Sequence, residues 1–316
     1  MKDRICWITY YLRNIWNYLT AKLHVPSLSV YRYPGKTFLD WTETQEWIRN
    51  RILSGTPTMV ARYGGNESHV TGEAIGMELG LMKGIRKKIL LQINRDAGLF
   101  PYGNETAYRF GMLMKESSAQ LDLLAVWRTV MQDYLINCIC PEGMAVTRLD
   151  NIEPYYGEHP WTSALKGKKV LVIHPFKDTI EAQYRKRERL FADPEILPEF
   201  QLRVVKAVQT IAYSEDSRFS SWFEALDFMY GEAMKEDFDV AIIGCGAYGF
   251  PLAAKIRESG KIAIHLGGAT QLLFGIKGKR WDGNPRISAL YNGDWTRPLP
   301  EDVPEQAGSV EDGCYW

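Results

Sequence analysis

Glycines and hydrogen-bonding side chains follow the predicted strands of this sequence. Residues 62–67 read Arg-Tyr-Gly-Gly-Asn-Glu, residues 174–177 read His-Pro-Phe-Lys, and residues 244–249 read Gly-Cys-Gly-Ala-Tyr-Gly. Open α/β sheets bind ligands at the carboxyl ends of their strands. The sequence therefore predicts a ligand site at these ends. The residues assigned to binding are Arg62, Gly64, Gly65, Asn66, Gly244, Gly246, Tyr248, Gly249, His265, Gly267 and Gly268.

The glycines of 244–249 match the pattern G-x-G-x-x-G, between a predicted strand and a predicted helix. Such glycines let the backbone approach a diphosphate at a helix N-terminus. A nicotinamide site would also require a carboxylate about 20 residues later. The next strand instead ends in residues 265–268, His-Leu-Gly-Gly. This favours a phosphate site without NAD, and the alternative is a tight turn with no ligand.

Three side chains are candidates for catalysis: Glu67, Asp96 and His174. Glu67 can hold a divalent metal or act as a general base. Asp96 can supply a second carboxylate facing it, and His174 can exchange a proton or contact a phosphate. Arg62 can clamp a phosphate with two hydrogen bonds. The structural alternatives are an Arg62–Glu67 ion pair and a histidine satisfied by backbone groups.

Strands and helices alternate along most of the chain, which predicts a doubly wound, mostly parallel, Rossmann-like α/β sheet. Continuous apolar runs such as Val-Leu-Val-Ile are typical of strands covered on both faces. The predicted strands are 58–63, 88–93, 121–127, 169–173, 202–208, 239–243 and 261–266. The predicted helices are 43–53, 67–81, 107–118, 178–190, 222–235 and 251–259.

The chain divides by composition into three parts. Residues 1–40 form an N-terminal helical segment, residues 41–282 form the α/β domain, and residues 283–316 form an irregular tail rich in Gly, Pro and Asp. A further boundary is predicted near 150–165, where prolines and glycines cluster.

Composition excludes some classes of protein. The 316 residues are 46% hydrophobic and 24% charged, and the 38 basic residues balance the 38 acidic ones. No overall field would attract nucleic acid. The five cysteines include no C-x-x-C pair, which argues against a disulfide framework and for a reducing compartment. We expect Cys138 and Cys140 to point to opposite faces of a strand.

The N-terminal residues 1–23 are aromatic and aliphatic, but basic residues interrupt them before any run reaches membrane-spanning length. No cleavage site of a signal peptide follows. Two interpretations stay open: a helix docked on the domain, or an interfacial helix lying on a membrane. The expected location is cytoplasmic, with peripheral contact at the inner face of the membrane.

Two of these segments resemble glycosyltransferases of the GT-D fold. Residues 62–67 look like the Arg-Phe-Gly-Asp-Gly-Glu stretch of that family, and residues 246–268 look like its closing turn, helix and strand. Residues 161–281 also resemble bacterial proteins encoded with polysaccharide genes. The sequence departs from the family at Gly65, which stands at the aspartate of the metal motif, and at His265.

The resemblance implies a transferase with a nucleotide-sugar donor, a saccharide or lipid-linked acceptor, and Mn²⁺ or Mg²⁺ bound through Glu67. It implies a role in surface polysaccharide assembly. The alternatives are a non-catalytic nucleotide-binding or scaffold protein, and another Rossmann-like enzyme such as a methyltransferase or an NAD-dependent enzyme. Loss of the family aspartate favours the scaffold.

Overall fold

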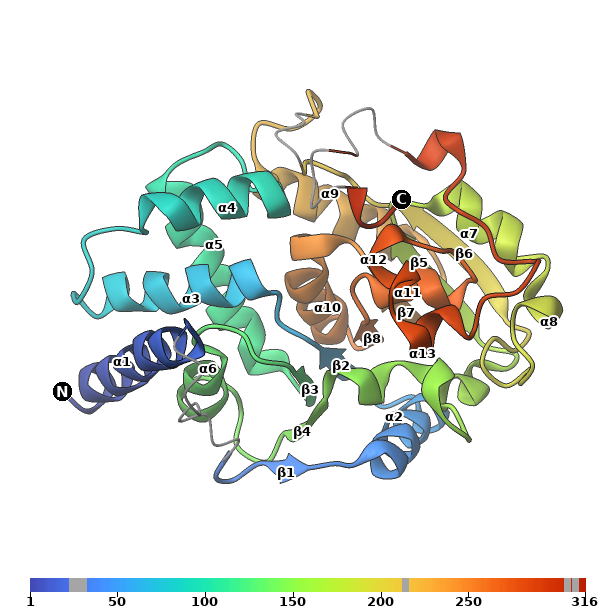
Figure 1. The fold of residues 1–316 in the computed structure, drawn as a ribbon, viewed down its shortest axis with the longest axis horizontal. Helices are drawn as coiled ribbons and strands as arrows, with labels where there is room; N and C mark the ends of the chain where they lie inside the picture. The colour runs from blue at the N-terminus through green and yellow to red at the C-terminus, as the bar shows by residue number, and fades with distance from the viewer. Residues whose placement is uncertain (23–32, 212–215, 304–307, 309–312) are drawn as a thin grey trace.

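A single parallel sheet organises the molecule (Figure 1). The computed structural model describes residues 1–22, 33–211, 216–303, 308 and 313–316. Within them the strand order is β1-β4-β3-β2-β8-β7-β5-β6, and every neighbouring pair is parallel. The predicted fold class is confirmed. The strands are β1 Thr37–Phe38, β2 Thr58–Ala61, β3 Leu123–Val126, β4 Ala145–Arg148, β5 Lys169–His174, β6 Gln201–Lys206, β7 Val240–Ile243 and β8 Ile262–His265.

Helices cover both faces of the sheet (Figure 1). The α-helices are α1 Lys2–Lys22, α2 Trp41–Ser54, α3 Gly65–Glu78, α4 Lys87–Ala97, α5 Asn104–Ser117, α6 Gln132–Cys138, α7 Lys177–Tyr184, α8 Arg187–Leu190, α9 Trp222–Lys235, α10 Gly249–Glu258, α11 Ala269–Leu273, α12 Lys279–Asp282 and α13 Pro285–Ser288. The 3-10 helices are η1 Ser118–Gln120, η2 Leu149–Ile152, η3 Pro154–Tyr156, η4 Trp161–Leu165, η5 Gly246–Tyr248 and η6 Pro300–Asp302.

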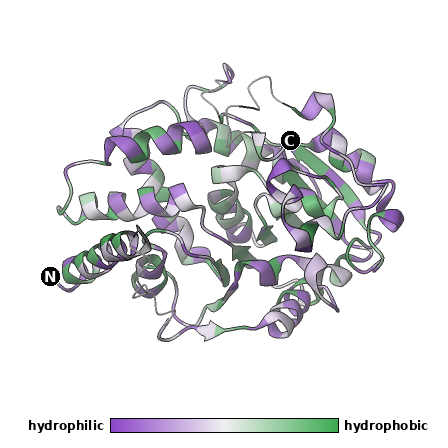
Figure 2. Cartoon of the chain, in the orientation of Figure 1, coloured by the Kyte–Doolittle hydropathy of each residue, from purple (hydrophilic) through white to green (hydrophobic). Residues whose placement is uncertain are grey.

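Two hydrophobic cores result from the alternation of side chains along each strand. In β5, Leu171 and Ile173 face the core shared with α3, α5, α9 and α10. Val170 and Val172 face the opposite core, shared with α2, η4 and α7. Figure 2 shows the strands at the centre of the sheet as hydrophobic. Burial on both faces explains why these strands are continuous apolar runs.

Local sequence signals fix both ends of helix α2. The Asp40 side chain accepts from the Glu43 amide while the Glu43 carboxylate accepts from the Asp40 amide, a capping box that starts α2. Gly55 ends the same helix in the left-handed region at φ 67°. The predicted helix 43–53 is therefore confirmed within a few residues, as are helices 67–81, 107–118, 222–235 and 251–259. The predicted helix 178–190 is divided into α7 and α8.

One predicted strand is wrong. Residues 88–93 belong to helix α4 rather than to a strand. The buried residues of α4 are Ile89, Leu90, Ile93 and Ala97, which lie on one side of a helix. A short aliphatic run fits a buried strand equally well, and its helical spacing becomes visible only when Ala97 is included. The sheet also contains β1 and β4, which the sequence did not reveal.

The prediction that Cys138 and Cys140 lie in a strand is wrong. Cys138 ends helix α6 instead of lying in a strand, and it is paired with Cys6 of α1, with Cα atoms 7.7 Å apart. Cys140, Cys245 and Cys314 are buried and form no disulfide within the described residues.

Both terminal segments of the chain contribute side chains to the hydrophobic cores. Trp7 of α1 is 4% exposed and belongs to one core, while Ile287 and Trp295 of the tail belong to the other. Residues 23–32, 304–307 and 309–312 of the predicted terminal segments lie outside the described residues. Within the described helices, none combines the length and apolarity that crossing a membrane requires.

Candidate functional site

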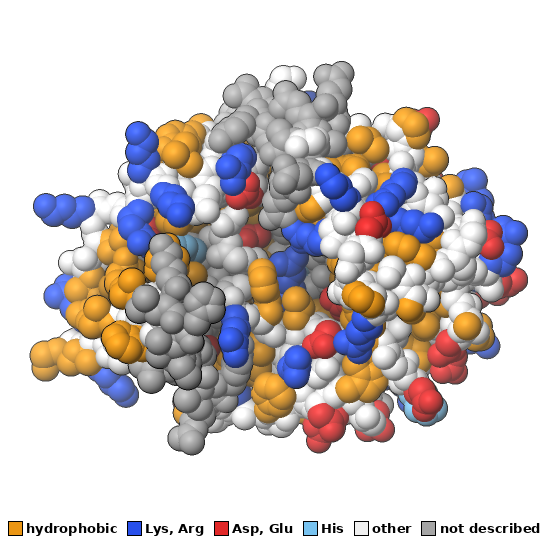
Figure 3. Space-filling model, in the orientation of Figure 1, with side chains coloured by type: hydrophobic (Ala, Val, Ile, Leu, Met, Phe, Trp, Pro, Cys, Tyr) orange, Lys and Arg blue, Asp and Glu red, His pale blue; other side chains and the backbone are white. Residues whose placement is uncertain are grey.

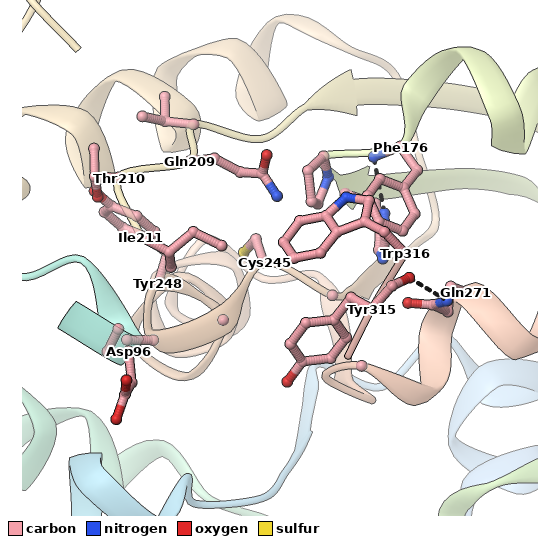
Figure 4. A pocket seen from close by; sticks show the side chains of 18 of the residues that line it. Asp96, Phe176, Gln209, Thr210, Ile211, Cys245, Tyr248, Gln271, Tyr315 and Trp316 are labelled. Carbon is pink, nitrogen blue, oxygen red and sulfur yellow. Dashed lines mark hydrogen bonds between the residues drawn. The ribbon is translucent and has the colours of Figure 1, made fainter. Parts of the chain in front are cut away.

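A pocket opens at the carboxyl ends of β5 and β7 (Figure 4). The chain leaves β5 through α7 toward β6, and it leaves β7 through α10 toward β8, on the other side of the sheet order. Neighbouring strands whose connections diverge leave a crevice, where ligands of such sheets bind. The pocket encloses about 720 Å³, its open mouth included.

Seven of the predicted site residues line this pocket, and seven others do not. The lining residues are Arg62, Asp96, His174, Gly244, Gly246, Tyr248 and Gly268. Outside the lining lie Gly64, Gly65, Asn66, Glu67, Gly249, His265 and Gly267. Residues of this second group contact the first directly, Gly267 against Arg62 and Asn66 against Asp96.

Arg62 follows β2, and its guanidinium lies over the backbone of Gly267. Gly267 has a φ of 64°, and a β-carbon there would stand 2.6 Å from Arg62 Nε. A glycine is therefore required for two reasons, the left-handed backbone and the overlying side chain. Among the described residues, no carboxylate forms an ion pair with this guanidinium. Its charge is left available to an anion in the pocket.

His174 ends β5 and is 3% exposed. Its Nδ1 accepts a 3.0 Å hydrogen bond from the Phe176 amide, so the neutral ring carries its proton on Nε2. Burial lowers the pKa of His174 to about 3, despite the opposing charge of Asp302. The imidazole is a neutral donor near pH 7, which fits a phosphate contact better than proton exchange.

Each glycine of residues 244–249 is favoured for a different structural reason. A β-carbon on Gly244 would stand 2.6 Å from His174 Cδ2, and one on Gly249 would overlap the His265 ring. Gly246 has a φ of 58° with open space around it. Gly246 starts η5, which continues into α10, and the first amides of a helix have no partner within it. An anion in the pocket beside Gly246 would meet these amides.

Glu67 lies on the first turn of α3, and its carboxyl group folds back against the Gly64 backbone, where a β-carbon would overlap it. Burial raises the pKa of Glu67, the charge of Arg62 opposes this, and the charge of Asp96 adds to it. Asn66 Nδ2 donates to Asp96 Oδ2 at 3.3 Å, which connects α3 to the end of α4. The charge of Asp96 therefore acts on the Glu67 carboxyl, and a catalytic role for either group stays a prediction.

His265 is buried beneath Gly249, outside the pocket lining. Neither ring nitrogen has a hydrogen-bond partner in the described part of the chain. Burial lowers the pKa of His265 well below its usual range, and the charge of Arg62 acts in the same direction. A contact between His265 and a ligand stays a prediction.

Aromatic side chains that the sequence did not single out complete the pocket. Phe176, Tyr315 and Trp316 join Tyr248, whose ring stacks on Trp222 at 4.4 Å. Gln271 Nε2 donates to the Tyr315 carbonyl, which holds the last residues against α11 (Figure 4). The only signal in the sequence was the adjacent aromatic pair at 315–316.

Two polar groups point into this aromatic part without partners. The indole Nε1 of Trp316 is buried and makes no hydrogen bond, and the carboxamide of Gln209 makes none within the described residues. Figure 4 shows the two side chains approaching each other across the pocket. A buried donor without a partner costs about 1–3 kcal/mol, so a ligand that accepts from it gains that energy.

Glu153 is a further residue that the sequence did not indicate. It follows η2, and its Oε2 accepts a 2.9 Å hydrogen bond from Tyr155 Oη. Burial raises the pKa of Glu153 to about 7, and hydrogen bonds from Tyr155 and Tyr156 reduce the effect. Glu153 lies outside the pocket lining but within the electrostatic reach of Arg62.

Comparison with known proteins finds likeness in fold only. No protein-family model and no curated protein matches the chain. A selenomethionine-substituted structure of domain of unknown function 1792 is 13% identical, covers 74% of this chain and 79% of that chain, and has a TM-score of 0.42.

A second structure of the same domain is described as having a distinct glycosyltransferase fold. It is 12% identical, covers 74% of this chain and 78% of that chain, and has a TM-score of 0.41. The resemblance predicted from the sequence is thus met again in the comparison of folds. At these scores the likeness concerns the fold and carries no argument about the site.

Proposed function

We propose that this chain is a glycosyltransferase that uses a nucleotide-sugar donor. The observation that carries the proposal is the composition of the pocket at the switch point. One part presents the unpaired guanidinium of Arg62, the neutral imidazole of His174 and the amides that follow Gly246. The other part presents aromatic rings and unpartnered donors. A nucleoside diphosphate combines the matching groups, an anion and a flat polar ring.

The leaving diphosphate gives the site its main electrostatic task. As the bond between the anomeric carbon and the phosphate oxygen breaks, negative charge develops on the diphosphate. Arg62 and His174 Nε2–H are placed to stabilise this charge, and fixed donors cost no reorganisation during the reaction. Tyr315 and Trp316 hold the nucleoside, with Gln209 beside the edge of the base.

The acceptor is activated by Glu67 in this proposal. The acceptor hydroxyl forms the new bond to the anomeric carbon, and its proton passes to the Glu67 carboxylate. The raised pKa of Glu67 makes it a stronger base than an exposed glutamate. Asp96 lines the pocket and accepts a hydrogen bond from Asn66, the residue before Glu67 in α3. The acceptor class is a saccharide or a lipid-linked saccharide, in cytoplasmic assembly of surface polysaccharide.

A divalent cation at this site would have few protein ligands. In the described ranges, no group of three or more His, Cys, Asp or Glu residues is arranged to hold a metal. Mg²⁺ is often held by one or two carboxylates together with substrate phosphates. Glu67 and Asp96 are the carboxylates that would hold Mn²⁺ or Mg²⁺ with the diphosphate, and the ion would neutralise charge on the leaving group. Glu67 would then be a metal ligand in place of the general base.

The second candidate is a non-catalytic nucleotide-binding or scaffold protein of the same fold. The small number of carboxylates and Gly65 at the position of the family aspartate favour it. A methyltransferase or an NAD-dependent enzyme is disfavoured because β8 ends without a carboxylate.

Thermal unfolding with a panel of ligands separates these candidates. The panel contains UDP, GDP, CMP, their sugars, NAD and S-adenosylmethionine, each with and without Mn²⁺. A ligand at 100 times its Kd adds about 2.7 kcal/mol to the free energy of unfolding. Stabilisation by one nucleoside diphosphate, with hydrolysis or transfer of its sugar, supports the transferase. Binding without turnover favours the scaffold, and stabilisation by NAD or S-adenosylmethionine overturns both.

A further inference from the structure

Helix α1 exposes a continuous apolar stripe. Ile5, Ile8, Leu12, Ile15 and Leu19 follow one another at intervals of three and four residues and are 59, 40, 58, 42 and 48% exposed. Residues at this spacing lie on one face of a helix. Trp16 and Tyr18 beside them are 51 and 59% exposed. A globular protein seldom leaves so many large apolar side chains in water on one helix.

The opposite face of α1 is attached to the domain. Trp7 is buried, and its Nε1 donates a 2.7 Å hydrogen bond to the Gly72 carbonyl of α3. The Arg13 guanidinium forms a 3.3 Å ion pair with Asp133 of α6. The helix is therefore held in one orientation with its stripe outward. The apolar side chains of the stripe are therefore turned away from the domain and available to another surface.

Basic side chains border this face. Lys2 and Arg4 lie at the start of α1. The segment between α3 and α4 adds exposed Lys83 and Arg86, and the first turn of α4 adds exposed Lys87 and Lys88. Contacts place the turn beside the helix: Arg86 Cζ lies 5.9 Å from the Tyr11 ring, and Arg4 Nη2 lies 3.4 Å from the β-position of Gly80. Figure 3 shows Lys and Arg side chains around hydrophobic ones at this end of the molecule.

The acidic side chains near this border are mostly neutralised. Glu73 pairs with Arg86, and Glu78 pairs with Lys115 at 2.6 Å. Asp3 is the acidic residue of α1 itself. Because Glu73 balances the charge of Arg86, the positive rim of this face consists of Lys2, Arg4, Lys83, Lys87 and Lys88.

We infer that α1 lies on an anionic lipid bilayer, with the stripe in the acyl boundary and the basic rim at the headgroups. Interfacial helices combine an apolar face, tryptophan and flanking lysine or arginine in this way, and clustered basic residues add attraction to acidic lipids. A coiled coil with a second copy fits less well, because the stripe covers fewer than the three heptads typical of such pairing. This inference does not depend on the proposed function.

Sedimentation with vesicles tests it on the full chain. We expect binding to vesicles of phosphatidylcholine with 30% phosphatidylglycerol, and at least tenfold weaker binding to phosphatidylcholine alone. The double variant Leu12→Glu/Ile15→Glu should lose at least tenfold in binding. Leu53→Glu, at a 52% exposed position of α2, is the matched control and should bind as the wild type does. Lys87→Glu/Lys88→Glu should reduce the preference for phosphatidylglycerol.

Two outcomes overturn the inference. One is equal binding of the wild type and of Leu12→Glu/Ile15→Glu, with unchanged circular dichroism spectra for both. The other is a wild-type dimer in light scattering that Leu12→Glu makes monomeric while vesicle binding is absent.

Discussion

The Arg62 guanidinium lies in the space that a side chain on residue 267 would need, so Gly267 makes room for it. The two residues come from neighbouring strand ends, those of β2 and β8. The orientation of the arginine therefore depends on a glycine that lies 205 positions later in the chain.

Substitution of Gly267 should act on the ligand through Arg62. We expect Gly267→Ala to displace the guanidinium and weaken pyrophosphate binding about tenfold or more, and we expect the same of Arg62→Ala, because each change removes one charge-assisted contact. Titration calorimetry on both variants and on the double variant gives the measurement. The double variant should bind no more weakly than Arg62→Ala alone, since both changes remove the same contact.

Gly260 offers the control for that experiment. Its φ of 85° is also left-handed, but nothing lies within 4 Å of its β-position. Gly260→Ala should lower stability without changing the affinity for pyrophosphate. Additive losses in Gly267→Ala and Arg62→Ala would contradict the shared role.

The aromatic part of the pocket should distinguish nucleotides from phosphate alone. We expect Trp316→Ala to reduce the affinity for a nucleoside diphosphate by about 1–3 kcal/mol, the usual worth of stacking one base on an aromatic ring. Affinity for pyrophosphate should be unchanged. Fluorescence or calorimetric titration with both ligands makes the comparison, and equal losses for the two would place the ring elsewhere than at the base.

Glu67→Gln should lower turnover by about 10²–10⁴-fold while the affinity for the nucleotide stays within a few-fold, because a general base acts on the acceptor proton. Glu78→Gln on the same helix is the control, since that carboxylate forms a surface ion pair with Lys115. Single-turnover rates and donor affinities are the measurements. Unchanged transfer by Glu67→Gln would remove Glu67 from the mechanism.

Gly65→Asp should create the carboxylate pair of the GT-D motif. The β-position of Gly65 has Trp127 as its near neighbour at 3.8 Å, and the first turn of a helix favours an acidic residue. We expect tighter Mn²⁺ binding in the presence of a nucleoside diphosphate, measured by electron paramagnetic resonance. If the affinity for Mn²⁺ does not change, Glu67 does not face a cation.

Glu153 should make stability depend on pH. Its folded-state pKa of about 7 exceeds the unfolded value of about 4.3, so the folded state binds more protons between these values. The free energy of unfolding contributed by this group therefore falls as pH rises from about 4 to about 7. Glu153→Gln should match the wild type near pH 4 and exceed it by up to about 3 kcal/mol at pH 8.

Urea unfolding at several pH values measures this difference. Exposed Glu158, five residues later, provides the control variant Glu158→Gln, which should leave the profile of the wild type unchanged. Parallel profiles for Glu153→Gln and the wild type would show that Glu153 ionises normally.

The sequence predicted the fold where one signal dominated. The run at β5 is apolar on both faces, and α2 carries its capping box and terminal glycine, so these elements were found nearly in place. The residues of α4 gave two readings, because Ile89 to Ile93 fit a strand or a helix until packing decides. Strand β1 is two residues long, and β4 ends in an exposed arginine, so neither has a pattern of its own.

The site was predictable where residues follow strands directly. Arg62 and Gly244 follow β2 and β7, His174 ends β5, and the sheet brings such positions together. Asp96 reaches the pocket from a helix instead of the predicted strand. Tyr315, Trp316 and Gln209 could not be assigned, because their approach depends on how the tail and the segment after β6 cross the sheet.

The order of the strands has a consequence for how the chain is made. Strand β2 emerges from the ribosome early and pairs with β3 on one side, but its other partner, β8, is about 200 residues away. Until β8 is synthesised, the middle of the future sheet is an open edge that can pair with another chain. Contacts of such long range also slow folding. During synthesis β2 is therefore an exposed strand edge, whereas in the folded chain it is paired on both sides.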